Sequence, residues 1–328
     1  MSTIVAPSDS SSQLQESSPT VRRSNVQTSS STTVATNPNI SAPFDAIRRL
    51  SDYLREHPEA ASALNAHYPK RGILKTGASP NATSDQNVTI DLSLAQAALI
   101  PAHLREILSR QGLNEILTFF ENVSNNASIG PILYTLSILS GTNMASVHKN
   151  HNFSFRLCDY NHSAADPDNL NSCGTHTDFG TFSIVFQDGT PGLEIEDANA
   201  PGTWHPVSGT ETVVLTGWCA LVLSGGRIPV ARHRVRCMPG VRRLSAVLYV
   251  APDAEVKLMP LNSTLREGGE KLRPFSRKIM SGEVSVEWFK KVMGKRWRYR
   301  VGNEVLDEGH ADHASMSQDS EIEKLVWG

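Results

Sequence analysis

His176 and Asp178 stand two positions apart in the segment CGTHTDFG, directly before a run of alternating apolar residues. Residues two apart on a strand point to the same face, so an imidazole and a carboxylate at this spacing can converge on one metal ion. His233 follows 57 residues later, beyond several predicted strands. Two histidines and one carboxylate leave positions open on a metal, which suits ferrous iron that reacts with oxygen, whereas zinc is the competing choice. The sequence therefore predicts a metal site at these three residues.

Each ligand candidate by itself has a simpler interpretation. A lone His176 is typical of a turn or strand end, Asp178 of a cap or turn, and His233, between two arginines, of a solvated strand. A second pair at the same spacing, His310 and Asp312, lies in a polar stretch with no predicted strand, and we expect it to be part of a solvated tail. Only the order and spacing of the first three residues together favour a metal site.

A possible carboxylate-binding pair follows the distal histidine. Arg243 lies ten residues after His233 in the segment RRLSAVLYVAP, and Ser245 is two positions further on the same predicted strand. A fixed guanidinium with a hydroxyl beside it is suited to bind a carboxylate through two hydrogen bonds. A metal triad followed by such a pair is a much rarer coincidence than either part alone.

The elements that must position these residues change character along the chain. Residues 1–40 are rich in Ser, Thr, Asn and Gln and predict a disordered tail. Residues 41–149 have apolar positions at helical spacing, with prolines 101 and 131 marking helix starts. Residues 150–254 contain many short apolar segments separated by turn signals, which is typical of an all-β sandwich or barrel. Residues 255–328 predict a C-terminal helical region and a polar tail.

Composition argues against several other classes of protein. Hydrophobic residues make up 39% of the 328 residues and the net charge is −2, so nothing indicates a nucleic-acid or membrane partner. The basic run at residues 290–300 contains aromatic residues and is interpreted as a helix packed on the core. The first residues lack the apolar core of a secretory signal, and the four dispersed cysteines form no zinc pattern. We expect a cytoplasmic protein with reduced thiols.

Four motifs together carry a family resemblance: HTD, GLEIED, LSGGRIPVARHRV and RRLS. Residues 150–254, which contain them, resemble the Fe(II)/2-oxoglutarate dioxygenases of the isopenicillin N synthase-like branch. The resemblance implies a mainly β fold with flanking helices, the double-stranded β-helix or jelly roll. It also implies that iron is bound by His176, Asp178 and His233, and that 2-oxoglutarate is bound by Arg243, Ser245 and Tyr160.

The activity implied by the resemblance is an oxygenase that uses Fe(II), 2-oxoglutarate and O2. It would hydroxylate or otherwise oxidise a small organic molecule, in specialised metabolism, while 2-oxoglutarate is decarboxylated to succinate. Separately, we expect the protein to be a monomer. The alternatives are an iron oxidase of the same fold that needs no 2-oxoglutarate, a non-catalytic jelly-roll binding protein and, third, a zinc hydrolase.

The chain departs from the family pattern in two places. The hallmark GFFxVxNHGI of the N-terminal region is not found, and Gly217-Trp218 stands where relatives often have Gly-Asp. We expect the Trp218 side chain to fill the core rather than line a substrate pocket.

Overall fold

The computed structural model describes most of the chain from residue 42 onwards and two short segments before it. The described residues are 21–22, 31–34, 42–66, 74–76, 88–93, 97–150, 152–160, 171–236, 238, 240–262, 274–301 and 318–328. The predicted His310–Asp312 pair and Cys237 lie outside them.

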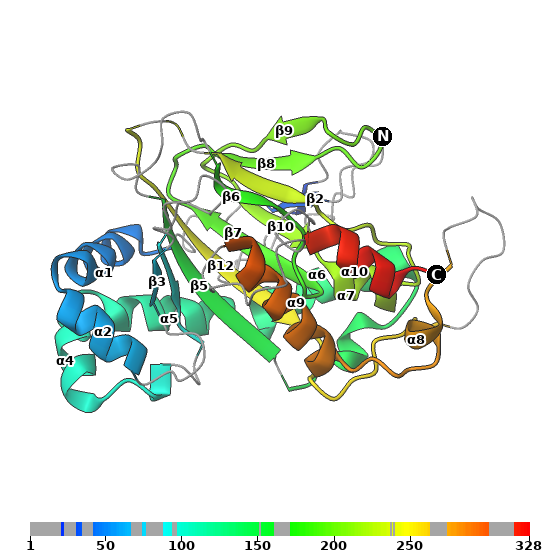
Figure 1. Cartoon of the computed structure of the whole chain (residues 1–328), viewed down its shortest axis with the longest axis horizontal. Coiled ribbons are helices and arrows are strands. Elements are labelled where there is room, and N and C mark those ends of the chain that lie inside the picture. Colours follow the sequence, from blue (N-terminus) through cyan, green and yellow to red (C-terminus); the bar gives the residue numbers. More distant parts are fainter. Residues whose placement is uncertain are drawn as a thin grey trace, which may run out of the picture.

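Two antiparallel sheets form the body of the protein (Figure 1). The larger sheet has the order β1-β2-β10-β7-β12-β5-β4-β3, and the smaller has the order β6-β11-β8-β9. The larger sheet comprises β1 (Val21–Arg22), β2 (Ser31–Val34), β3 (Leu74–Thr76), β4 (Val88–Asp91), β5 (Asn152–Tyr160), β7 (Phe182–Gln187), β10 (Thr212–Thr216) and β12 (Arg243–Ala251). The smaller sheet comprises β6 (Asn171–His176), β8 (Leu193–Glu196), β9 (Trp204–Pro206) and β11 (His233–Arg236). This arrangement confirms the predicted mainly β jelly roll with flanking helices.

The helices lie on either side of the sheets. Figure 1 shows α1, α2, α4 and α5 gathered at one end of the larger sheet, and α8 and α10 at the other. The helices are α1 (Phe44–Glu56), α2 (Pro58–Ala66), α4 (Ala102–Arg110), α5 (Leu113–Val123), α6 (Asn126–Ser140), the 3₁₀ helix η1 (Met144–Val147), α7 (Trp218–Leu223), α8 (Arg277–Met280), α9 (Val286–Val301) and α10 (Gln318–Val326). None of the described helices is both long and apolar enough to cross a membrane.

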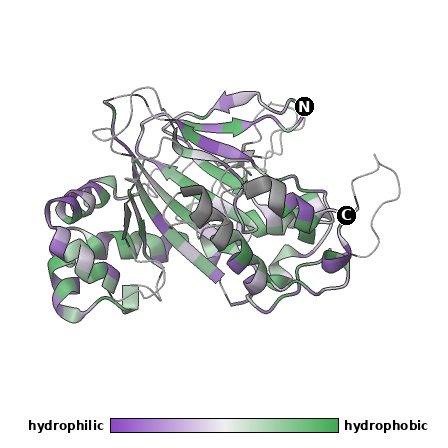
Figure 2. Cartoon of the chain, in the orientation of Figure 1, coloured by the Kyte–Doolittle hydropathy of each residue, from purple (hydrophilic) through white to green (hydrophobic). Residues whose placement is uncertain are grey.

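Helix α1 shows how the sequence pattern places the helices. Its buried residues include Ala46, Ile47, Leu50 and Leu54, which recur at the three- and four-residue spacing of one helix face. Figure 2 shows hydrophobic and hydrophilic residues alternating along this helix, as expected when one side packs and the other is solvated. Apolar periodicity therefore determines which side of the helix packs against the rest of the protein.

Two expectations about the helices and the tail differ from the structure. The proline at position 131 lies inside α6, which begins at Asn126, because the side chain of Asn125 caps the helix by accepting a hydrogen bond from the Ser128 amide. In the tail, β2 (Ser31–Val34) pairs with β10, so the prediction of disorder is wrong for the described tail residues. A short strand of this kind satisfies the backbone groups at a sheet edge.

The two long strands β5 and β12 separate two kinds of environment. They pair in register, and their side chains alternate between the two faces of the sheet. One face contributes Phe155, Leu157, Leu244, Ala246, Leu248 and Val250 to the large core beneath the helices. The other face lines a cavity between the sheets with Arg156, Cys158, Tyr160, Arg243, Ser245, Val247 and Tyr249. Polar side chains on that second face are the first indication of a site.

Candidate active site

The three predicted metal ligands converge where β6 and β11 meet. His176 ends β6, His233 begins β11, and the two residues are direct partners across the antiparallel pair. His176 Nε2 lies 3.7 Å from Asp178 Oδ1, and His233 Nε2 lies 4.0 Å from Asp178 Oδ2. All three residues are buried, and their potential ligand atoms lie within 4.8 Å of one another. A single metal ion can therefore contact all three side chains.

Hydrogen bonds from the rings fix which nitrogen faces the ion. His176 Nδ1 lies 2.8 Å from the Gly174 carbonyl oxygen, and His233 Nδ1 lies 2.9 Å from that of Ala231. Because a carbonyl only accepts, each Nδ1 carries the proton and each Nε2 keeps its lone pair for a metal. Both histidines are thus held in the form that binds a metal.

Ser183 supports the carboxylate ligand and was not identified from the sequence. Its hydroxyl, on the fully buried start of β7, donates a short hydrogen bond to Asp178 Oδ2. The only sequence signal was its place two residues after a Gly-Thr pair in an otherwise apolar strand. Such outer-shell partners orient metal ligands and affect affinity.

The turn that carries Asp178 rests on the start of α7. The Trp218 amide donates to the Asp178 carbonyl oxygen at 3.0 Å. A Cβ atom at Gly217 would lie 2.4 Å from the Gly180 carbonyl oxygen and 2.6 Å from that of Asp178. The backbones can therefore approach only because residue 217 is glycine. The Trp218 side chain itself is buried in the large core, as predicted.

The predicted carboxylate-binding residue Arg243 is fully buried and only partly hydrogen-bonded. Its Nη2 donates to Gln187 Oε1 at 2.8 Å, and its guanidinium lies over the Tyr160 ring, 5.2 Å from the ring centre. Its Nε and Nη1 have no hydrogen-bond partner among the described residues. Buried charged donors without partners are costly, and a bound carboxylate would offset that cost. Gln187, which fixes one side of this guanidinium, was not singled out from the sequence.

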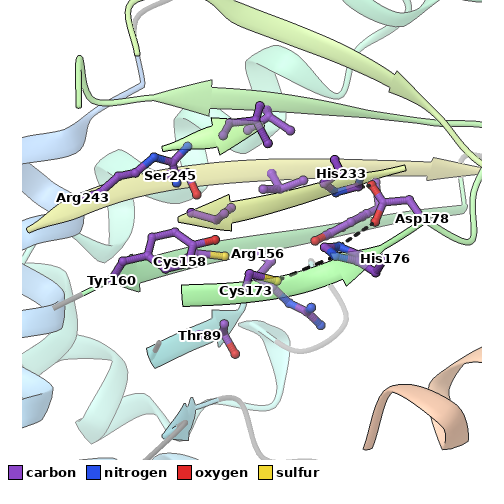
Figure 3. Close-up of a pocket in the computed structure, with 15 residues that line it drawn as sticks. Thr89, Arg156, Cys158, Tyr160, Cys173, His176, Asp178, His233, Arg243 and Ser245 are labelled. Carbon is purple, nitrogen blue, oxygen red and sulfur yellow. Dashed lines mark hydrogen bonds and ion pairs between the residues drawn. The ribbon is translucent and has the colours of Figure 1, made fainter. Parts of the chain in front are cut away.

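The same cavity joins the two groups of residues. It has a volume of about 40 Å³. All six residues predicted to form the site line it: Tyr160, His176, Asp178, His233, Arg243 and Ser245. Figure 3 shows Arg243, Ser245 and Tyr160 toward one end and the triad toward the other. Tyr160 is the direct strand partner of Arg243. The donor sets at the two ends therefore fit a divalent metal and a carboxylate group, respectively.

Comparisons with known proteins agree with this geometry. The sequence profile of the 2OG-Fe(II) oxygenase superfamily matches residues 151–252, the segment that carries the triad and Arg243. This segment belongs to the 2OG-Fe(II) oxygenase superfamily. This match confirms the family resemblance inferred from the motifs.

Curated relatives match the oxygenase domain over a limited length. The 2-oxoglutarate-Fe(II) type oxidoreductase ppzD of Metarhizium rileyi is 37% identical over 102 residues, which is 28% of this chain and 29% of the relative. The proline hydroxylase buaE of Petromyces alliaceus is 34% identical over 29% of this chain and 33% of its own length. The matches thus span about a third of these relatives.

Solved structures share the fold of the oxygenase over a larger part of the chain. The rice dioxygenase for auxin oxidation is 18% identical with a TM-score of 0.50, covering 82% of this chain and 83% of its own. A full-length Neurospora crassa protein, solved in complex with alpha-KG and 5-formyluracil, is 15% identical with a TM-score of 0.54, covering 77% and 81%. At these identities the likeness supports the jelly-roll fold alone.

Proposed function

We propose that the protein is an Fe(II)- and 2-oxoglutarate-dependent oxygenase that hydroxylates or otherwise oxidises a small organic molecule of specialised metabolism. The reaction would consume O2 and convert 2-oxoglutarate to succinate. The observation that carries the proposal is the buried Arg243, whose Nε and Nη1 have no hydrogen-bond partner among the described residues and which shares a cavity with the His176, Asp178 and His233 triad. We also propose that it acts as a cytoplasmic monomer without nucleic-acid or membrane partners, in keeping with its net charge of −2.

Each group in the cavity has a distinct role in this proposal. His176, Asp178 and His233 would hold the iron, which with 2-oxoglutarate and O2 supplies the oxidising chemistry. Arg243 and Ser245 would bind the distal carboxylate of 2-oxoglutarate, and Tyr160 would add a hydrogen bond to it. Apolar side chains between the two ends keep water out, which strengthens the electrostatic interactions within the cavity.

The test is anaerobic reconstitution with Fe(II) and 2-oxoglutarate, followed through the visible charge-transfer band of the chelate. We expect a band in the wild type, none in His176→Ala, and a weaker band in Arg243→Met at equal 2-oxoglutarate concentration. Arg232→Met is the matched control, because Arg232 pairs with Glu196 outside the cavity.

The possible failures separate the alternatives. Bound iron without a band would indicate an oxidase that needs no 2-oxoglutarate. No bound iron would overturn the proposal in favour of a non-catalytic binding protein, and tightly bound zinc with hydrolytic activity would favour a hydrolase.

A further inference from the structure

A second arginine lines the cavity without a role in the metal or co-substrate site. Arg156 lies on the cavity face of β5, four residues before Tyr160, so it is displaced along the strand from Arg243. Figure 3 shows Arg156 beyond Cys158, nearer to His176 than Arg243 is. Tyr249 lies diagonally across from it on the cavity face of β12, because the direct strand partner of Arg156 is Val247 and that of Tyr249 is Ser154. These two side chains form a polar wall on the metal side of the cavity.

Asp91 holds the Arg156 guanidinium in one orientation. The two residues are direct partners on β4 and β5. Arg156 Nε donates to Asp91 Oδ1 at 2.7 Å, and Nη2 donates to Oδ2 at 3.3 Å. The guanidinium carbon lies 5.6 Å from the centre of the Tyr249 ring. Asp91 is the only hydrogen-bond partner of Arg156 in the described part of the chain, so the Nη1 edge is left for another acceptor.

The charge at this wall is balanced before any ligand binds. Burial lowers the pKa of Arg156, but the attraction and hydrogen bond of Asp91, together with Tyr249 and Cys158, raise it above its usual value, so the guanidinium stays charged. Burial raises the pKa of the Tyr249 hydroxyl well above its usual value, so the hydroxyl stays neutral and can donate. The positive charge of Arg156 is therefore offset by Asp91, and a second carboxylate would be repelled by the first.

We propose that Arg156 and Tyr249 bind a neutral carbonyl-type oxygen of the substrate, such as that of an amide or lactone, while Asp91 selects against carboxylates. The inference rests on the proposed oxygenase function and names the substrate class. An arginine fork offers paired donors to such an oxygen, and a buried hydrogen bond to a charged donor contributes more than one between neutral groups. Binding there would place the substrate beside the metal ligands rather than at the Arg243 end.

The experiment compares the binding of small amides with that of the carboxylates that have the same carbon skeleton, such as phenylacetamide and phenylacetate. Both aromatic and aliphatic pairs are used. Ligand-observed NMR titrations are run anaerobically on full-length protein with Fe(II) and excess 2-oxoglutarate, so that the Arg243 end is occupied. We expect the wild type to prefer the amides, and Arg156→Met to bind them at least about tenfold more weakly. Asp91→Asn should reverse the preference toward carboxylates.

Arg234→Met is the matched control. Arg234 has the same environment outside the cavity, an ion pair with Glu194 and a guanidinium 4.0 Å from the centre of the Trp204 ring. The Arg234→Met variant should bind all probes as the wild type does. If the Asp91–Arg156 pair has only a structural role, both Asp91→Asn and Arg156→Met should weaken the binding of amide and carboxylate probes alike. That result would overturn the inference.

The remaining outcomes are equally decisive. Equal binding of amides by wild type and Arg156→Met, preference of the wild type for carboxylates, or no binding of any pair would each contradict the inference. The charge-transfer band, recorded on the same samples, reports the proposed function separately. If the band is normal but Arg156→Met binds the probes as the wild type does, only the substrate class is refuted. If the band is missing but probe binding still depends on Arg156, only the oxygenase chemistry is refuted.

Discussion

His176 and His233 are direct partners across β6 and β11, with ring centres 4.2 Å apart. Strand pairing thus brings together two residues 57 positions apart in the chain. The metal site is built on the backbone hydrogen bonds of the sheet, which holds the ligands more rigidly than a loop would.

Replacing either histidine should abolish tight metal binding. For His176→Ala and His233→Ala we expect a larger loss of Fe(II) affinity than the roughly 10–100-fold typical of an outer-shell partner, measured by anaerobic calorimetry. His205→Ala is the control, because His205 also faces a carboxylate, Asp197 at 3.4 Å, but lies outside the cavity. Equal affinity in His205→Ala and His176→Ala would contradict the assignment of the triad.

Ser183 should matter for the metal more than for the fold. Ser183→Ala removes the donor to Asp178 Oδ2 and should weaken Fe(II) binding by about 10–100-fold. Ser224→Ala is matched, since Ser224 is also buried and donates to a carbonyl, that of Leu221. Each variant should lose about 1 kcal/mol of unfolding free energy in urea titrations. If Fe(II) affinity falls equally in both, Ser183 has no special role.

Gly217→Ala should disturb the turn that carries Asp178. The new Cβ would press on two carbonyl oxygens of that turn, so we expect a loss of about 1–3 kcal/mol of unfolding free energy together with weaker metal binding. Gly130→Ala provides the contrast, because nothing lies within 4 Å of its Cβ position in α6. That helix substitution should change the free energy of unfolding by less than about 1 kcal/mol in the same urea titration, because the helix preference of alanine is opposed by its contact with Pro131. Wild-type metal affinity in Gly217→Ala would show that the turn tolerates the shift.

Arg242, the residue before Arg243, connects the barrel to α1. Arg242 donates to both carboxylate oxygens of the buried Asp159, at 2.9 and 2.6 Å, and pairs with Asp52 of α1. Arg242→Leu should therefore lower the free energy of unfolding by about 2 kcal/mol, measured in urea. Arg110→Leu breaks an exposed pair with Glu106 and should cost less than about 1 kcal/mol. Similar losses in both would contradict a structural role for the buried carboxylate.

The positions of His176 beside Asp178 and of Arg243 beside Ser245 were predictable because local spacing carries the information. His176 and Asp178 lie two apart at a strand end, and Arg243 and Ser245 lie two apart within a strand, so period-two geometry places each pair on one face without knowledge of the fold. The apolar repeats of α1 were readable for the same reason.

Other features depend on contacts between distant parts of the chain. The Asp91–Arg156 pair joins residues 65 apart, and the Arg243–Gln187 hydrogen bond joins residues 56 apart. The pairing of Ser31–Val34 with β10 had no signal in a polar tail, since the edge of the sheet supplies its partner.

The sequence by itself determined which residues are candidate metal and carboxylate ligands, because residue types and spacing restrict what side chains can bind. Only the tertiary structure decided that Arg243 is buried with two nitrogen atoms that no described residue contacts by a hydrogen bond. It also decided that two backbone segments approach each other at Gly217, and that Arg156 faces the same cavity with Asp91 beside it. Burial, close approach and charge balance depend on which strands pack together, and strand pairing between distant segments is not encoded in local periodicity.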